Sequence, residues 1–303
     1  YGSRQAVPLV EKMSGREDRF MICRAVSCEE DMTVISELID EFDAVIICDV
    51  PSEKKNDILK ICFDRSKRTY VTPKLSDIII RGAEQIHLFD TPLLVCRNTG
   101  LSAEELILKR MLDLAVSLVG FIVTLPIMLI TALCIKLYDG GPVFYTQERL
   151  TKDGKVFKVY KFRSMRTDAE SDGVARLAGE NDDRITPVGK VIRKVRIDEL
   201  PQILNVLKGD MSIVGPRPER PELAAENEKI MPEFSYRLKV KAGLTGYAQV
   251  LGKYNTTPYD KLRLDLMYIE QYSFLLDLKL ILMTIKILFV PESTEGVKED
   301  KLS

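Results

Sequence analysis

Residues 114–135 read LAVSLVGFIVTLPIMLITALCI, a run of twenty-two residues without a charged side chain. A run longer than about 18 apolar residues is typical of a helix that enters a bilayer. Lys109 and Arg110 precede the run, Lys136 follows it, and Pro126 lies just past its middle. A proline inside a helix removes a backbone hydrogen bond and bends or breaks the helix. The segment is therefore either a kinked spanning helix or a re-entrant helix that is broken at Pro126 and returns to its starting side.

The sequence around this run favours the re-entrant form. Basic residues at both ends indicate that both ends stay on the cytoplasmic side. Everything after Tyr138 carries the glycine, proline and charge of a soluble catalytic domain. We therefore predict a linker helix and a re-entrant membrane helix over residues 99–138, and a mainly helical α+β catalytic domain over residues 139–290. Ser102, followed by Ala103-Glu104-Glu105, is expected to cap the start of the linker helix.

Residues 1–98 have the pattern of an α/β domain. Helical stretches near 32–41 and 52–66 alternate with short strand-like runs at 44–48 and 69–71, an order typical of a parallel sheet covered on both faces. A dinucleotide-binding sheet would carry G-x-G-x-x-G after its first strand, and only Gly2 and Gly15 are available there. We expect a degenerate Rossmann-like domain with a regulatory or structural role.

Composition narrows the class of protein. The 303 residues are enough for two domains, and a formal net charge of −1 does not indicate a nucleic-acid partner. His87 is the only histidine, which nearly excludes a histidine base or a two-histidine metal site. Six cysteines without a C-x-x-C pair fit reduced thiols in a cytoplasmic setting. The start at Tyr1 without methionine indicates a piece of a longer chain, and the polar tail 291–303 is expected to be disordered.

The catalytic part of the chain is locally basic. Residues 149–196 hold thirteen Lys or Arg and seven Asp or Glu, which fits an anionic neighbour such as a phosphate or a membrane surface, or else a solvated basic face. Extended segments are expected near 143–145 and 156–162, and helices over 183–208 and 258–289. The apolar end of the last helical region could lie in the membrane interface or pack in the core.

Two adjacent carboxylates stand out in the run Asp198-Glu199-Leu200-Pro201-Gln202. Proline is favoured in the first turn of a helix, so this pair is expected at or just before a helix N-terminus. The helix dipole and nearby arginines would keep the carboxylates ionised, and free amides there suit a phosphate. An ionised aspartate can attack phosphorus or help to hold Mg²⁺. The alternative is ordinary helix capping by acidic residues.

Further cationic and glycine-rich strings surround this pair in the sequence. In Gly215-Pro216-Arg217-Pro218-Glu219 two prolines fix the backbone around one guanidinium, which suits phosphate recognition or a structural turn. Lys161-Phe162-Arg163-Ser164-Met165-Arg166 is a second cationic cluster. In Gly243-Leu244-Thr245-Gly246 the glycines allow close backbone approach to a ligand, or simply a turn.

Taken together, these strings resemble the bacterial sugar transferase family, the monotopic polyprenyl-phosphate phosphoglycosyl transferases. The matching strings are Asp198–Gln202, Asn205–Ser212 and Val214–Glu219, with Phe144-Tyr145, Gln147, Arg149, Lys161–Met165 and Gly243–Gly246 in family order across about 105–290. The resemblance implies that Asp198 is the nucleophile, that Glu199 is its partner, that both hold Mg²⁺, and that Arg217 holds phosphate. The other expected substrate-binding residues are Lys161, Arg163, Arg196, Gln202, Pro218 and Glu219. Members often carry serine before the helix-breaking proline, where this chain has Leu125.

The function that the resemblance implies is transfer of a sugar-1-phosphate from a nucleotide sugar, usually a UDP-sugar, to polyprenyl phosphate, with release of UMP. This would be the first membrane step of exopolysaccharide, capsule, O-antigen or glycoprotein glycan synthesis, at the cytoplasmic face of the bacterial inner membrane. The α/β domain resembles that of the longer family members, and we expect it to serve dimerisation or regulation. A non-catalytic membrane adaptor with a ligand-sensing α/β domain is the alternative.

Overall fold

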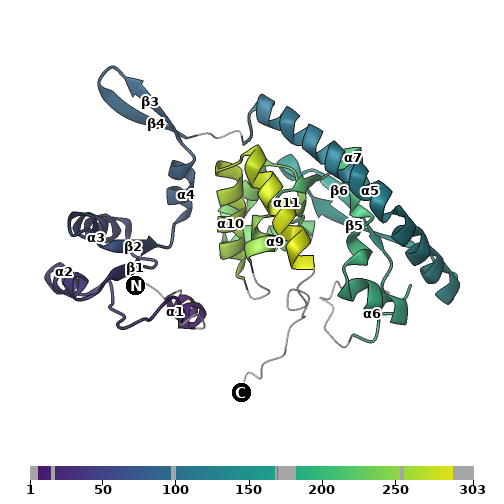
Figure 1. The fold of residues 1–303 in the computed structure, drawn as a ribbon, viewed down its shortest axis with the longest axis horizontal. Coiled ribbons are helices and arrows are strands. Elements are labelled where there is room, and N and C mark those ends of the chain that lie inside the picture. Colours follow the sequence, from purple (N-terminus) through teal and green to yellow (C-terminus); the bar gives the residue numbers. More distant parts are fainter. Residues whose placement is uncertain are drawn as a thin grey trace. The chain divides into compact units, whose positions relative to one another are not determined.

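The computed structural model of the chain describes residues 6–14, 18–96, 100–167, 169, 182–252 and 256–288 (Figure 1). The tail over 291–303, expected to be disordered, lies outside the described residues. The chain folds into two compact units, residues 1–77 and 78–303. The predicted domain boundary after residue 98 falls within the second unit, so the use of residues 1–98 as one functional domain stays a prediction.

The first unit alternates helices and strands. Its elements are α1 (Ala6–Ser14), α2 (Met32–Glu41), β1 (Ala44–Ile47), α3 (Ser52–Asp64) and β2 (Arg68–Val71). Strands β1 and β2 are parallel, and Ile35, Ile39 and Ile58 from the helices pack against Ile47 in one core. The α/β alternation is therefore confirmed. Among the described residues this sheet has only these two strands, so the wider Rossmann-like sheet remains a prediction.

A helix and a hairpin that the sequence patterns did not indicate come next. Helix α4 (Leu75–Arg81) is followed by β3 (Glu84–Leu88) and β4 (Thr91–Val95), which pair as an antiparallel hairpin. Every residue of the two strands is exposed, including Leu94 and Val95. Such a hairpin has no buried face, so the alternation of buried and exposed residues that would reveal it from the sequence is missing.

The apolar run forms the greater part of α5 (Ala103–Asp139), the one helix among the described residues that is long and apolar enough to cross a membrane. Its predicted start is confirmed, because the Ser102 hydroxyl accepts from the Glu105 amide and the Glu105 carboxylate accepts from the Ser102 amide. The helix is continuous through Pro126 and ends at Gly140. The re-entrant break at Pro126 is therefore not confirmed, and the long apolar helix itself is what the structure shows.

The remaining elements of the second unit form short sheets and helices beside α5. They are β5 (Phe144–Leu150), η1 (Lys152–Gly154), β6 (Val156–Phe162), α6 (Pro187–Lys194), η2 (Ile197–Glu199), α7 (Gln202–Lys208), β7 (Ser212–Val214), α8 (Pro221–Ile230), η3 (Pro232–Lys239), β8 (Gly243–Thr245), α9 (Tyr247–Leu251), α10 (Pro258–Glu270) and α11 (Phe274–Leu288). β5 and β6 are antiparallel, and β7 and β8 are parallel. The expected extended segments and helical regions are confirmed, with the last helical region divided into α10 and α11.

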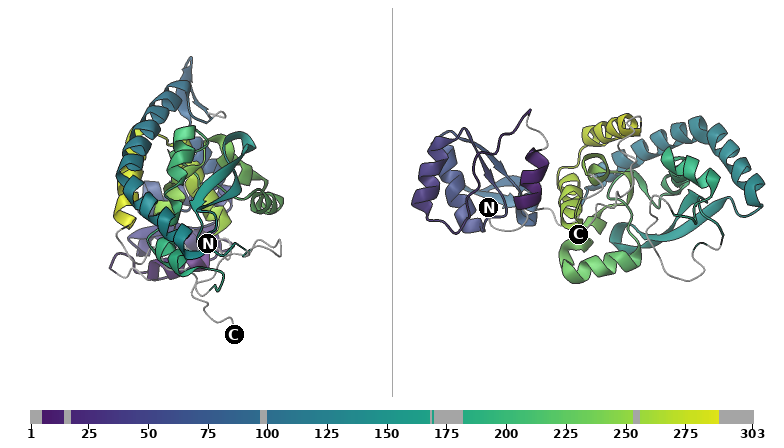
Figure 2. Two further views of the ribbon diagram at one scale, coloured as in Figure 1. Left: turned by 90° about the vertical axis from the view of Figure 1, so that its right-hand side faces the viewer. Right: turned by 90° about the horizontal axis from the view of Figure 1, so that it is seen from below.

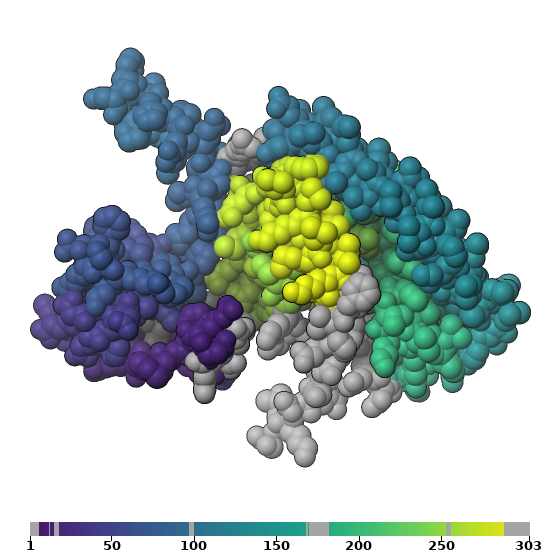
Figure 3. Space-filling model, in the orientation of Figure 1, coloured from purple at the N-terminus to yellow at the C-terminus, as the bar shows by residue number. Residues whose placement is uncertain are grey.

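Two helices share one side of the second unit. Both views of Figure 2 place α11 beside α5 on the same side, and Lys109 of α5 is paired with Asp277 of α11 at 2.7 Å. α11 turns Asp277 and Leu280 inward, whereas Leu275 and Leu282 are exposed, and the outer surface of α11 is visible in Figure 3. The inner face of α11 thus packs in the core, and a position of its outer face in the membrane interface stays a prediction.

Candidate active site

Asp198 and Glu199 lie in the 3-10 turn η2, which leads directly into α7. Arg196, just before this turn, has a φ of 54°, in the left-handed region that side chains seldom adopt. The turn reverses the chain after α6 and brings the two carboxylates to the start of α7, where Pro201 had indicated them. We refer to Asp198 and Glu199 below as the carboxylate pair.

Glu199 is held by cations from two distant segments. Its Oε1 atom lies 2.8 Å from Nζ of Lys161 on β6 and 2.9 Å from a terminal nitrogen of Arg217, which follows β7. Burial alone would raise the pKa of Glu199, but the charges of Arg217 and Lys161 outweigh burial and hold that pKa well below its usual range. Glu199 is therefore a fixed anion that orients both cations.

Asp198 has a different environment from its neighbour. Burial and the negative charge of Glu199 raise the pKa of Asp198, while Lys161 and Arg193 act in the opposite direction. Within the described part of the chain, Glu199 forms ion pairs and Asp198 forms none. A carboxylate whose oxygens are not engaged by a cation keeps the electron density that an attack on phosphorus requires. The two members of the pair are thus chemically distinct.

The loop that carries Arg217 is packed closely against the β8 segment. A Cβ atom on Gly243 would overlap the backbone nitrogen of Gly215, and one on Gly246 would overlap the Gly215 carbonyl oxygen. Only glycine permits this approach. The close contact that the glycines of Gly243–Gly246 were expected to allow is therefore with the chain's own Arg217 loop.

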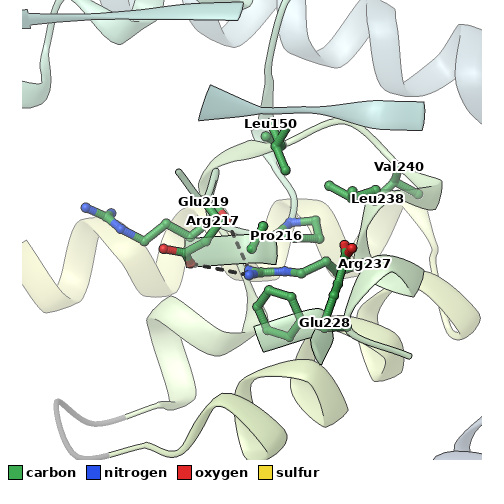
Figure 4. Close-up of a pocket in the computed structure, with 11 residues that line it drawn as sticks. Leu150, Pro216, Arg217, Glu219, Glu228, Arg237, Leu238 and Val240 are labelled. Atoms are coloured by element: carbon green, nitrogen blue, oxygen red, sulfur yellow. Dashed lines mark hydrogen bonds and ion pairs between the residues drawn. The ribbon is translucent and has the colours of Figure 1, made fainter. Parts of the chain in front are cut away.

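A buried arginine, Arg237, is hydrogen-bonded to the backbone of the same loop. Arg237 donates a hydrogen bond to the main-chain carbonyl of Arg217 at 3.0 Å, and its other terminal nitrogen lies 3.4 Å from Glu219 (Figure 4). Asp265, also buried, lies 2.8 Å from Arg237. This charge network was not detected from the sequence, because its members lie on η3 and α10, far from the recognisable strings.

The other predicted site residues differ in their burial and in the groups that they contact. Arg163 is buried and directs its guanidinium to both carboxylate oxygens of Asp139 and to the Pro142 carbonyl, so a phosphate could reach it only by displacing Asp139. The Pro218 carbonyl accepts a hydrogen bond from Arg149. Arg196 is exposed at the turn before the pair, and Gln202 is buried as the first residue of α7. Their substrate-binding roles stay predictions.

The long apolar helix is attached directly to the helix behind the carboxylate pair. Arg110 of α5 donates to the carbonyl oxygens of Val206 and Leu207 at 2.7 and 2.9 Å, which satisfies the last turn of α7. Asn205 of α7 joins β6, accepting from the Tyr160 amide and donating to the Lys158 carbonyl. Because α7 begins beside Glu199 and β6 carries Lys161, these contacts fix the pair relative to α5.

Comparison with known proteins identifies the family of the chain. The family model of the bacterial sugar transferases matches residues 104–291. The chain is 37% identical over 258 residues to an undecaprenyl-phosphate glucose phosphotransferase of Komagataeibacter xylinus, covering 82% of this chain and 48% of that protein. It is 43% identical over 182 residues to a UDP-N-acetylgalactosamine-undecaprenyl-phosphate N-acetylgalactosaminephosphotransferase of Aeromonas hydrophila, covering 59% and 43% of the two chains.

A shorter relative is matched almost completely. The exopolysaccharide production protein PSS of Rhizobium leguminosarum bv. phaseoli is 41% identical over 201 residues, which is 63% of this chain and 98% of that protein. The chain therefore belongs to the bacterial sugar transferase family. It spans about half the length of the first two relatives.

Proposed function

We propose that this protein transfers a sugar phosphate from a UDP-sugar to polyprenyl phosphate and releases UMP, as a step in the synthesis of a surface polysaccharide. The observation that carries the proposal is the arrangement of Asp198 beside Glu199, with Glu199 locked between Lys161 and Arg217. Two cations, Lys161 and Arg217, beside one reactive carboxylate suit a phosphate centre. The relatives named above, which act on undecaprenyl phosphate by their names, support the same reaction class.

In the proposed reaction an Asp198 oxygen bonds to the sugar-linked phosphorus. The bond from that phosphorus to the bridging oxygen breaks, and its electron pair leaves with UMP. An oxygen of polyprenyl phosphate then attacks the phospho-aspartate, which restores the Asp198 carboxylate and gives the lipid-linked sugar diphosphate. Lys161 and Arg217 remain positioned by Glu199 throughout and balance the charge on the phosphoryl oxygens.

A magnesium ion fits this site only with help from the substrate. Among the residues that the structure describes, no three His, Cys, Asp or Glu side chains gather. Mg²⁺ commonly takes one or two carboxylates and completes its shell with water and phosphate oxygens, so Asp198 and Glu199 would supply its protein ligands. When bound, the ion would neutralise phosphate charge.

The geometry of α5 supports a one-sided attachment to the membrane. Its buried residues run along both halves of the helix, from Lys109 and Ser117 to Met128 and Ile135. The same folded unit therefore covers one face of the apolar run from end to end, while Val119, Ile122, Ile130 and similar residues face outward. We propose that α5 enters one leaflet with both ends at the cytoplasmic face of the inner membrane, where the nucleotide sugar is available.

Release of UMP tests the proposed function. Purified protein in lipid nanodiscs would be supplied with a panel of UDP-sugars, with and without undecaprenyl phosphate. We expect one or more sugars to give sustained UMP release only when the lipid phosphate is present. When the lipid is absent, a release of no more than about one UMP per active site would fit the covalent step. No release from any UDP-sugar of the panel would contradict the proposal and favour a membrane adaptor.

A further inference from the structure

Three arginines, Arg149, Arg217 and Arg220, lie close together where the end of β5 meets the segment after β7. Arg149, at the end of β5, donates through one terminal nitrogen to the Pro218 carbonyl at 3.2 Å, and through the other to Gln147 at 2.6 Å. The adjacent Leu150 amide donates to the Glu219 carbonyl at 2.9 Å. These bonds fasten the end of β5 to the segment Arg217–Arg220. Arg149 is therefore held against the short, proline-containing segment that carries Arg217 and Arg220.

The positive charge of this group is poorly balanced by the protein. Glu219, the nearest carboxylate, turns toward the buried Arg237. Glu199 is shared by Lys161 and Arg217. Burial and the repulsion of Arg220 and Arg217 lower the pKa of Arg149, as expected where cations are crowded. Among the described residues, the Arg220 guanidinium has no hydrogen-bond or ion-pair partner. Arg149 and Arg220 are crowded together without a carboxylate ion pair among the described residues, and this is a cost that a bound anion would remove.

The place of these arginines relative to Asp198 defines which anion fits. Arg217 donates a hydrogen bond to Glu199, the neighbour of Asp198. In the proposed reaction, Arg217 is therefore placed to bind the phosphoryl group that Asp198 attacks. Arg220 lies three residues further along that segment, and Arg149 of β5 contacts the segment at the Pro218 carbonyl. In a nucleoside diphosphate sugar, the phosphorus next to the attacked one belongs to the nucleotide, and the two share a bridging oxygen. When the bond to that oxygen breaks, new negative charge appears on the nucleotide's phosphate.

We propose that Arg149 and Arg220 bind the nucleotide's own phosphate, the leaving group of the first step, while Arg217 holds the transferred one. This assignment rests on the proposed function and divides the donor diphosphate between two sets of cations. It gives Arg149 and Arg220 a role in donor binding and in stabilising the departing monophosphate. The lipid phosphate, which has the same chemistry, is the competing occupant.

Binding of UMP and of uridine separates the contribution of the nucleotide's phosphate from that of the base and ribose. The two ligands would be titrated calorimetrically into the whole protein in nanodiscs, for the unchanged protein, Arg149→Gln, Arg220→Gln and the control Lys229→Gln. Lys229 is exposed at the opposite end of α8. We expect the unchanged protein and the control to bind UMP more tightly than uridine. In each arginine variant UMP affinity should fall by about tenfold, with uridine affinity unchanged.

The outcomes distinguish this assignment from the proposed function. An arginine variant that binds UMP as the unchanged protein does would overturn the assignment and leave the transferase proposal standing. An unchanged protein that does not distinguish UMP from uridine would also overturn the assignment, whereas the transferase proposal is overturned only by the absence of UMP release. As a second measurement, Arg149→Lys keeps the charge but not the fork of donors, and should raise KM for the UDP-sugar and not for polyprenyl phosphate. A rise confined to polyprenyl phosphate would assign the arginines to the lipid and contradict the proposal.

Discussion

Arg237 holds Arg217 by its backbone, through a hydrogen bond of 3.0 Å from a terminal guanidinium nitrogen to the Arg217 carbonyl oxygen. The side chain of Arg237 is 5% exposed, whereas that of Arg217 is 49% exposed. A buried cation thus fixes the main chain of a surface cation whose side chain reaches Glu199. This separation of roles makes several consequences measurable.

Asp265, the buried partner of Arg237, should impose a pH dependence on stability. Burial raises the pKa of Asp265 to about 6, against the opposing effect of Arg237. Because the folded pKa exceeds the ordinary one, its contribution to stability is fully present below about pH 4 and is lost as the pH rises through 6. We expect the unfolding free energy to gain roughly 3 kcal/mol from this group between pH 7 and pH 4, and Asp265→Asn to abolish that gain.

Chemical denaturation of both proteins across this pH range measures the difference. Other carboxylates titrate in both proteins, so only the difference between them reports on Asp265. A difference that stays constant from pH 7 to pH 4 would refute the raised pKa. The geometry supports the expectation, because Asp265 Oδ2 and Arg237 Nε have no hydrogen-bond partner among the described residues, although the pair is close.

Lys161 should set the acid limb of the pH–rate profile. Asp198 must be ionised to attack, and Lys161 favours its ionised form. Lys161→Met removes that charge and also releases Glu199, so we expect the acid limb to move to higher pH and the rate to fall by at least about 100-fold. Lys158→Gln, an exposed lysine on the same strand, is the matched control. If the acid limb does not move in Lys161→Met, then Lys161 does not affect the ionisation of Asp198.

Arg163 offers a test of a structural role against a substrate-binding one. Its contacts with Asp139 join the end of α5 to β6, and they hold the pKa of Asp139 at about 2. That stabilisation is present above pH 4 and is lost as the pH falls through 2. We expect Arg163→Gln and Asp139→Asn to lower the melting temperature at pH 7 by similar amounts, with little change in KM for the nucleotide sugar. A raised KM without a lower melting temperature would show that Arg163 binds the substrate phosphate and does not stabilise the fold.

Labelling of introduced cysteines tests the topology of α5. Single cysteines at Glu104 and Lys136, in a background without the native ones, would be exposed to a membrane-impermeant reagent in intact and inverted vesicles. We expect both to react only in inverted vesicles, because one folded unit covers both halves of α5. Reaction of the two positions from opposite sides would establish a spanning helix instead.

The sequence predicted those features that depend on local rules. The apolar run, the Ser102 cap and the helix after Pro201 follow from composition and spacing, and each is present. The prediction of a break at Pro126 relied on the local effect of proline on a helix. In the structure the helix is continuous, and Met128 and Ile135 after the proline pack against the catalytic unit. The exposed hairpin at β3 and β4 had no periodic signal to detect.

For the site, the residue types could be predicted from the sequence, but their partners could not. Lys161, Glu199 and Arg217 were each predicted, yet only the fold shows that one carboxylate oxygen receives both cations. Arg237 and Asp265 escaped prediction, because a buried charge pair depends on contacts between distant segments. The contact of Arg163 with Asp139 was likewise not predicted, and the substrate-binding role of Arg163 stays a prediction.

The nucleophilic role of Asp198 can be tested by the mass of the protein after a single addition of the donor. The intact protein would be mixed with a UDP-sugar without polyprenyl phosphate, quenched and analysed by mass spectrometry with peptide mapping. We expect an added sugar phosphate on Asp198, absent from Asp198→Asn and removed when polyprenyl phosphate is supplied. An adduct on Glu199, or sustained turnover by Asp198→Asn, would contradict it.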